Sequence, residues 1–166
     1  MQIGDKVNAA MNAQITHELD ASYRYLAMSA WCQEQRLPGA AAWLRNQAEE
    51  EVEHAMKFFD FIQSRSGTIN LQALPQPPAE YADVRAVFTA ALKHERHISA
   101  LIHDLYALAG QEDDFASQQF LQWFLSEQVE EEENVSGVLD RLALVGDSGY
   151  GLLLIDQELA QRGEDE

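Results

Sequence analysis

The sequence has a single cysteine, Cys32, and only four prolines and nine glycines among 166 residues. One cysteine excludes an internal disulfide framework and any metal site built from several thiolates. The longest strongly apolar run, residues 152–155, is far too short to cross a bilayer. Residues 1–6 contain no apolar stretch of the kind found in secretory signals. We therefore expect a soluble, cytoplasmic protein with no membrane partner.

Basic residues are also scarce, because 11 Lys and Arg stand against 28 Asp and Glu, a formal net charge of −17. Such an acidic chain repels nucleic acid and anionic membranes, and it attracts cations. The composition is otherwise globular, with 46% hydrophobic and 23% charged residues. The length fits one domain, which we expect to cover residues 1–166.

Prolines and glycines fall in four clusters, and the segments between them are rich in strong helix formers. Each of the four long segments carries an apolar stripe with helical spacing. The pattern predicts an all-α fold, a four-helix bundle followed by a short fifth C-terminal helix. The expected helices cover residues 5–36, 39–65, 82–109, 114–145 and 149–162.

The connections between these helices predict the topology. The first and second helices, and the third and fourth, are separated by a few residues, so each pair should form an antiparallel hairpin. About 16 residues without helical pattern join the second helix to the third. Fully extended they reach ~50 Å, whereas a helix of about 28 residues is ~42 Å long. We therefore expect a long crossover between the two hairpins.

Acidic residues interrupt all four apolar stripes near their middles. Buried carboxylates are costly unless an opposite charge compensates them, and the stripes contain no Lys or Arg. His54 lies three residues after Glu51, on the same helix face. Carboxylates with an imidazole favour Fe, Mn or Zn, and several around one histidine indicate two ions with a bridging carboxylate. The acids at similar heights are Glu18, Glu51, Glu95 and Glu127.

The other four histidines lie off the stripes, and we interpret them as surface or packing residues. They are His17, His94, His97 and His103.

The order and spacing of these motifs resemble those of bacterial non-haem ferritins, which belong to the ferritin-like di-iron family. The resemblance runs from Val7 to about Ala160. Its carriers are Glu18-Leu19-x-Ala21-Ser22-x-x-Tyr25, Glu49-Glu50-Glu51-x-x-His54, His94-Glu95 and Gln122-Trp123-x-x-x-Glu127-Gln128-x-Glu130-Glu131.

The resemblance implies a role for each matching residue. Glu18, Glu51 and His54 would hold a first iron. Glu51 would bridge to a second iron held by Glu95, with Gln128 close by. Tyr25 would lie beside the centre. A third iron would be held by Glu50, Glu127, Glu130 and Glu131.

The resemblance also implies ferroxidase activity: Fe(II) is oxidised by O2 or H2O2 and stored as a ferric mineral inside a homo-oligomeric shell of 24 subunits. The fifth helix would pack around a four-fold axis of that shell, because its apolar face is too small to matter within one subunit. Bacterioferritins bind haem through a Met between the Glu and His of the second-helix motif. Val52 and Glu53 occupy that stretch here, so no haem is expected.

Two alternatives remain open from the sequence. One is an oxidase with a permanent di-iron or di-manganese cofactor, although no second domain or obvious substrate pocket is visible. The other is a non-enzymatic acidic helical scaffold, which predicts no Fe(II)-dependent consumption of O2.

Overall fold

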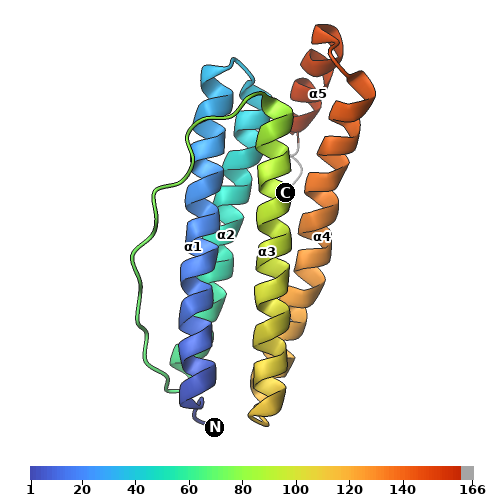
Figure 1. Cartoon of the computed structure of the whole chain (residues 1–166). Helices are drawn as coiled ribbons and strands as arrows, with labels where there is room; N and C mark the ends of the chain where they lie inside the picture. The colour runs from blue at the N-terminus through green and yellow to red at the C-terminus, as the bar shows by residue number, and fades with distance from the viewer. Residues whose placement is uncertain (162–166) are drawn as a thin grey trace.

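In the computed structural model, residues 1–161 are described and form five α-helices and no strand (Figure 1). This confirms the predicted all-α fold, a four-helix bundle with a short fifth helix. The predicted helix end at 162 lies outside the described residues, and the other ends lie within two residues of the expected positions. No described helix is long and apolar enough to span a membrane. The helices are α1 (Asp5–Glu34), α2 (Pro38–Ser64), α3 (Val84–Gln111), α4 (Phe115–Val145) and α5 (Gly149–Gln161).

Aspartate caps fix the first turns of α3 and α4. Asp83 Oδ1 accepts a 2.7 Å hydrogen bond from the Ala86 N–H, and Asp114 Oδ1 accepts one of 3.1 Å from the Ser117 N–H. Each carboxylate satisfies a backbone donor that has no partner within its own helix. The cap explains why α3 begins at residue 84 and not at the expected residue 82.

The segment between α2 and α3 runs the length of the bundle beside α1 (Figure 1). Asn12 on α1 anchors it: its Nδ2 donates to Thr68 O at 2.8 Å, and its Oδ1 accepts from the Asn70 N–H at 2.6 Å. The crossover therefore makes α2 and α3 parallel, while the α1–α2 and α3–α4 pairs are antiparallel hairpins. The predicted topology is confirmed.

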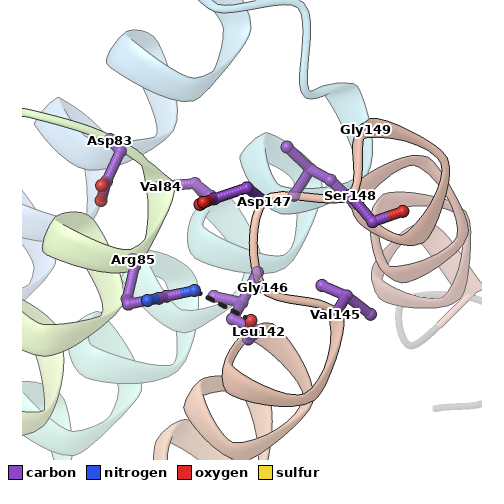
Figure 2. A pocket seen from close by; sticks show the side chains of 10 residues that line it. Asp83, Val84, Arg85, Leu142, Val145, Gly146, Asp147, Ser148 and Gly149 are labelled. Atoms are coloured by element: carbon purple, nitrogen blue, oxygen red, sulfur yellow. Dashed lines mark hydrogen bonds between the residues drawn. The ribbon is translucent and has the colours of Figure 1, made fainter.

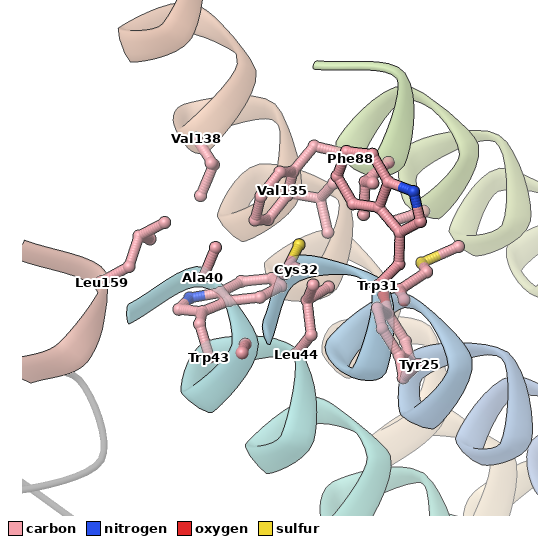
Figure 3. Packing of buried hydrophobic residues seen from close by; sticks show 14 of the residues in the cluster. Tyr25, Trp31, Cys32, Ala40, Trp43, Leu44, Phe88, Val135, Val138 and Leu159 are labelled. Atoms are coloured by element: carbon pink, nitrogen blue, oxygen red, sulfur yellow. The ribbon is translucent and has the colours of Figure 1, made fainter. Parts of the chain in front are cut away.

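Two apolar clusters fill the bundle, and a polar layer separates them. The cluster next to α5 contains Trp31, Trp43 and Phe88 (Figure 3), and the other contains Met11 and Phe58. In every long helix, the passage from one cluster to the other crosses buried polar side chains. These are Glu18 on α1, Glu51 and His54 on α2, Glu95 on α3, and Gln128 and Glu131 on α4.

Helix α5 docks onto its own subunit, contrary to the expectation that it matters only between subunits. Ile155 and Leu159 are buried in the cluster next to α5, and Asp156 Oδ1 accepts a 2.8 Å hydrogen bond from the Ala40 N–H. Gly39 permits this contact, since a Cβ there would lie 1.7 Å from the Asp156 carbonyl oxygen. The apolar area of α5 alone does not reveal this polar anchor. The exposed apolar side chains of α5 are Tyr150, Leu153 and Leu154.

Candidate metal centre

Three of the predicted ligands meet at the middle of the bundle. Glu18, Glu51 and His54 each offer one ligand atom, and these atoms lie within 4.8 Å of one another. Their exposed fractions are only 1%, 2% and 4%. His54 Nδ1 is 3.3 Å from Glu51 Oε2, as the three-residue spacing predicts. This group is the one to which the resemblance assigns the first iron.

Glu95 reaches the same layer from α3 and is held by two donors. The Tyr25 hydroxyl donates to Glu95 Oε1, and Gln128 Nε2 donates to Glu95 Oε2 at 3.2 Å. The structure thus brings both predicted neighbours to this fully buried carboxylate. Glu95 itself is not part of any three-ligand group within 4.8 Å among the described residues. Glu95 is therefore a buried hydrogen-bond acceptor in the same layer, outside the three-ligand groups.

A second group joins His54 to Glu127 and Glu131, again with ligand atoms within 4.8 Å of one another. His54 Nε2 lies 3.8 Å from Glu127 Oε1, so the two ring nitrogens face different carboxylates. The exposed fraction of Glu131 is 2%, whereas the Glu127 side chain is 27% exposed. Two further residues predicted for the third iron do not join either group: Glu50 is half-buried and Glu130 is exposed.

Burial determines the protonation of the centre. It raises the pKa of Glu18 to about 7, although hydrogen bonds with Gln14 and Glu51 oppose the rise. It also raises the pKa of Glu51, helped by the charges of Glu95 and Glu18, and it raises the pKa of Glu95. Burial, with the nearby Lys57 charge, lowers the pKa of His54 to about 4, so the imidazole is neutral at pH 7. Cations therefore compete with protons for the carboxylate oxygens, while the imidazole lone pair is free to bind.

Two glutamines position the carboxylates, and the sequence argument gave them no role. Gln14 Nε2 donates to Glu18 Oε1 at 2.8 Å, and Gln47 Nε2 donates to Glu131 Oε2 at 2.7 Å. Both are polar residues within buried stripes, one helical turn before Glu18 and Glu51. A buried amide requires a hydrogen-bond partner. A glutamine within an apolar stripe, one turn before a buried glutamate, is therefore the sequence feature that could have identified both residues.

The exposed indole of Trp123 packs beside the buried ring of His54. The two ring centroids are 5.4 Å apart in an edge-on arrangement, and Lys57 Nζ lies 4.3 Å from the centroid of the indole ring. The indole edge thus limits the positions that the His54 ring can adopt.

A pocket of about 260 Å³ lies at the end of the bundle, between the start of α3 and the α4–α5 turn (Figure 2). Arg85 Nη2 crosses it to donate a 3.1 Å hydrogen bond to Leu142 O, near the carboxylates of Asp83 and Asp147. Arg85 precedes Glu95 by ten residues on α3, about 15 Å of helix. The pocket is thus separate from the carboxylate centre.

Comparison with known proteins agrees with this arrangement. The family model of the ferritin-like domain matches residues 8–145. The bacterial non-heme ferritin of Escherichia coli O6:H1 is 39% identical over 150 residues, 90% of this chain and 91% of the relative. The bacterial non-heme ferritin of Bacteroides fragilis 638R is 36% identical over 160 residues, 96% of this chain and 99% of the relative. The crystal structure of an open pore ferritin from the archaeon Archaeoglobus fulgidus matches with a TM-score of 0.95 and 40% identity, covering 96% of this chain and 98% of that chain. The chain belongs to the ferritin family.

Proposed function

We propose that this protein is an iron-storing ferroxidase. It oxidises Fe(II) with O2 or H2O2 at a di-iron centre within each subunit, and it stores the Fe(III) as a mineral inside a cytoplasmic shell of 24 subunits. The observation that carries the proposal is the convergence of Glu18, Glu51 and His54, with Glu95 in the same buried layer. Membership of the ferritin family supports iron storage as the role.

The ligand sets follow from the side chains that face one another. Glu18, Glu51 and His54 hold the first Fe(II), and Glu51 bridges to a second Fe(II) held by Glu95 with Gln128 beside it. Charge supports two ions: the layer contains several buried carboxylates, and the nearest imidazole is neutral. Each arriving Fe(II) replaces protons that burial otherwise retains on the carboxyl groups.

Each oxidation consumes two Fe(II) ions, so that the electrons lost by iron equal those gained by the oxidant. Two Fe(II) each lose one electron, and O2 takes up both electrons with two protons, giving two Fe(III) and one H2O2. With H2O2 as the oxidant, two electrons and two protons give two Fe(III) and two H2O. The Tyr25 hydroxyl donates a hydrogen bond to Glu95 Oε1 beside the second iron, and burial raises its pKa, so it stays protonated and orients that carboxylate. A pair of irons thus avoids one-electron reduction of O2.

Movement of Fe(III) away from the centre requires one iron to be weakly held. Gln128 supplies only a neutral amide, a weaker metal ligand than the imidazole of His54, so the second iron is held less tightly than the first. We propose a third iron near Glu127 and Glu131, where the observed group with His54 supplies ligands. Glu50 and Glu130 complete that set by rotating inward. Glu127 is partly exposed and Glu130 is exposed, which gives a path from the buried layer to solvent.

Oxygen consumption by metal-free protein tests the ferroxidase assignment. After two Fe(II) per subunit are added aerobically, the wild type should consume O2 in a rapid phase. His54→Ala should slow that phase at least about tenfold, because an iron ligand is lost. The exposed neighbour Glu53→Gln is the matched control and should behave as wild type. Equal rates for wild type and His54→Ala would contradict the proposal.

A further inference from the structure

Three of the five histidines gather where α1 faces α3, outside the carboxylate centre. The centroids of the His17 and His97 rings are 6.2 Å apart, and those of His94 and His97 are 6.3 Å apart. Asp20 lies one helical turn after His17, and its charge acts on both His17 and His94. The sequence predicts only surface or packing roles for these histidines, but the fold assembles them into one cluster.

Two atoms of this cluster are buried without a hydrogen-bond partner: His94 Nε2 and Asp20 Oδ1. Buried polar atoms in native proteins nearly always have partners, so such atoms indicate a missing ligand or water. The second carboxylate oxygen of Asp20 is occupied, since Arg24 Nε donates to it at 2.8 Å. One acceptor oxygen and one ring nitrogen thus remain available on the same seam between α1 and α3.

We propose that His17, Asp20, His94 and His97 bind one divalent transition-metal ion. The ligands form two pairs, His17-x-x-Asp20 and His94-x-x-His97, and each pair shares one helix face. Three imidazoles and a carboxylate suit a four-coordinate ion such as Zn²⁺. At a tetrahedral ion, Zn–N bonds of about 2.0–2.1 Å place the centroids of two bound imidazoles about 5 Å apart. The observed separations of 6.2 and 6.3 Å are longer. No three of the four residues have ligand atoms within 4.8 Å of one another, so the side chains must rotate toward the ion to close the site.

The site flanks the carboxylate centre without sharing its ligands. His17 and His94 directly precede Glu18 and Glu95, so the cluster lies at the same height and about 100° around each helix. His97 is exposed and His17 is half-buried, which gives an ion access from solvent. None of the four residues belongs to the proposed di-iron centre, so Zn²⁺ binding at this cluster does not depend on the ferroxidase proposal.

Titration of the metal-free protein with Zn²⁺, followed by calorimetry, tests the number of sites. The wild type should bind one more Zn²⁺ per chain than the double variant His17→Ala/His97→Ala. The exposed His103→Ala, on the same helix as His97, is the control and should retain the wild-type number. Co²⁺ supplies a second measurement, because a four-coordinate Co²⁺ ion absorbs strongly in the visible range. The wild type and His103→Ala should show this absorption, and the double variant should lack it. Equal stoichiometry and equal Co²⁺ spectra in wild type and double variant would overturn the proposal.

Arg24 provides a variant that strengthens the site. Its guanidinium opposes a bound cation and holds one oxygen of Asp20. Arg24→Gln should therefore tighten Zn²⁺ binding at this site about fivefold, the factor expected when one nearby charge repulsion is removed near the surface. Tighter Zn²⁺ binding cannot result from misfolding, so this variant complements the double variant, in which binding is lost. Unchanged or weaker Zn²⁺ binding in Arg24→Gln would contradict the assignment of Asp20 as a ligand.

Discussion

The side-chain amide of Gln47 on α2 donates a 2.7 Å hydrogen bond to Glu131 Oε2 on α4, and both groups are buried. The residues are 84 positions apart in sequence, and the bond joins the two hairpins at the height of the carboxylate layer. An amide donor favours the ionised form of the carboxyl that accepts from it. If Glu131 belongs to the proposed third iron site, Gln47 prepares its carboxylate to bind a cation.

Replacing Gln47 should weaken the proposed third iron site. In Gln47→Met the buried volume is nearly retained, but Glu131 loses its donor and its fixed orientation. We expect about tenfold weaker binding at that site, the usual cost of losing a residue that orients a ligand. Anaerobic Fe(II) titration should report this loss, while rapid oxidation of the first two irons persists. The exposed Gln122→Met on α4 is the control, and equal titrations for Gln47→Met and the control would oppose this role.

Glu95 should be needed for oxidation and dispensable for folding. Glu95→Gln retains an acceptor for the Tyr25 hydroxyl and removes a carboxylate that burial disfavours in its charged form. The metal-free variant should melt at or slightly above the wild-type temperature, while its initial oxidation slows at least about tenfold.

Glu95→Leu separates the two contributions, because it leaves the buried Tyr25 hydroxyl without its acceptor. It should lower the free energy of unfolding by about 1–3 kcal/mol relative to Glu95→Gln. A Glu95→Gln protein that is unstable yet oxidises iron normally would show that the residue is structural.

The buried carboxyl groups should lower the stability of the metal-free protein as pH rises. Burial raises the pKa of Glu18 from 4.5 to about 7 and also raises those of Glu51 and Glu95. Because the folded-state pKa lies above the unfolded-state value, the stabilisation is complete below about pH 4.5 and is lost as pH rises through about 7. For Glu18 the loss is on the order of 3 kcal/mol.

Calorimetric melts with a chelator at pH 5 and pH 8 measure this loss. Zn²⁺-loaded protein should lose much less stability over the same range, since bound ions replace the protons. Glu18→Gln should show a smaller pH dependence than wild type. The lowered pKa values of His54 and His94 act in the opposite direction, because they make stability rise as pH rises toward 6.5. The carboxyl contribution is therefore the difference between the wild type and Glu18→Gln, and an equal pH dependence in the two proteins would contradict the buried-carboxyl account.

Substitutions on the two faces of α5 should have different effects. Leu153 and Leu154 are exposed on a single subunit, so Leu153→Lys/Leu154→Lys should disrupt assembly while the subunit remains folded. Ile155→Ala should instead lower the melting temperature, because a buried side chain is truncated at a cost of about 2–5 kcal/mol. Light scattering measures the assembly, with exposed Gln157→Lys as the control. A shell that survives the double lysine change would exclude this face from the interface.

Much of the carboxylate layer was predictable from the sequence. A glutamate at a stripe position, such as Glu18 or Glu95, must face the core if the helix is amphipathic. Helical periodicity says less about α4, because five closely spaced glutamates, Glu127 and those at 130–133, cover much of the helix circumference. The structure was needed to show that Glu131 is buried and Glu130 exposed.

Contacts between elements were not predictable in the same way. The cluster of His17, His94 and His97 depends on which side of α1 meets α3, and the stripes specify only the side that meets the core. The docking of α5 depends on a hydrogen bond between Asp156 and the first turn of α2, which leaves no periodic signal.

The number of irons oxidised and retained per chain tests the central claim most directly. Metal-free protein is given Fe(II) aerobically in successive additions, first two per subunit and then many more, while O2 uptake, particle size and bound iron are followed. We predict a rapid phase that saturates at two Fe(II) per subunit, followed by continued uptake into a large assembly far beyond three irons per chain. Iron binding that stops at two per chain, or uptake without Fe(II)-dependent O2 consumption, would contradict the account.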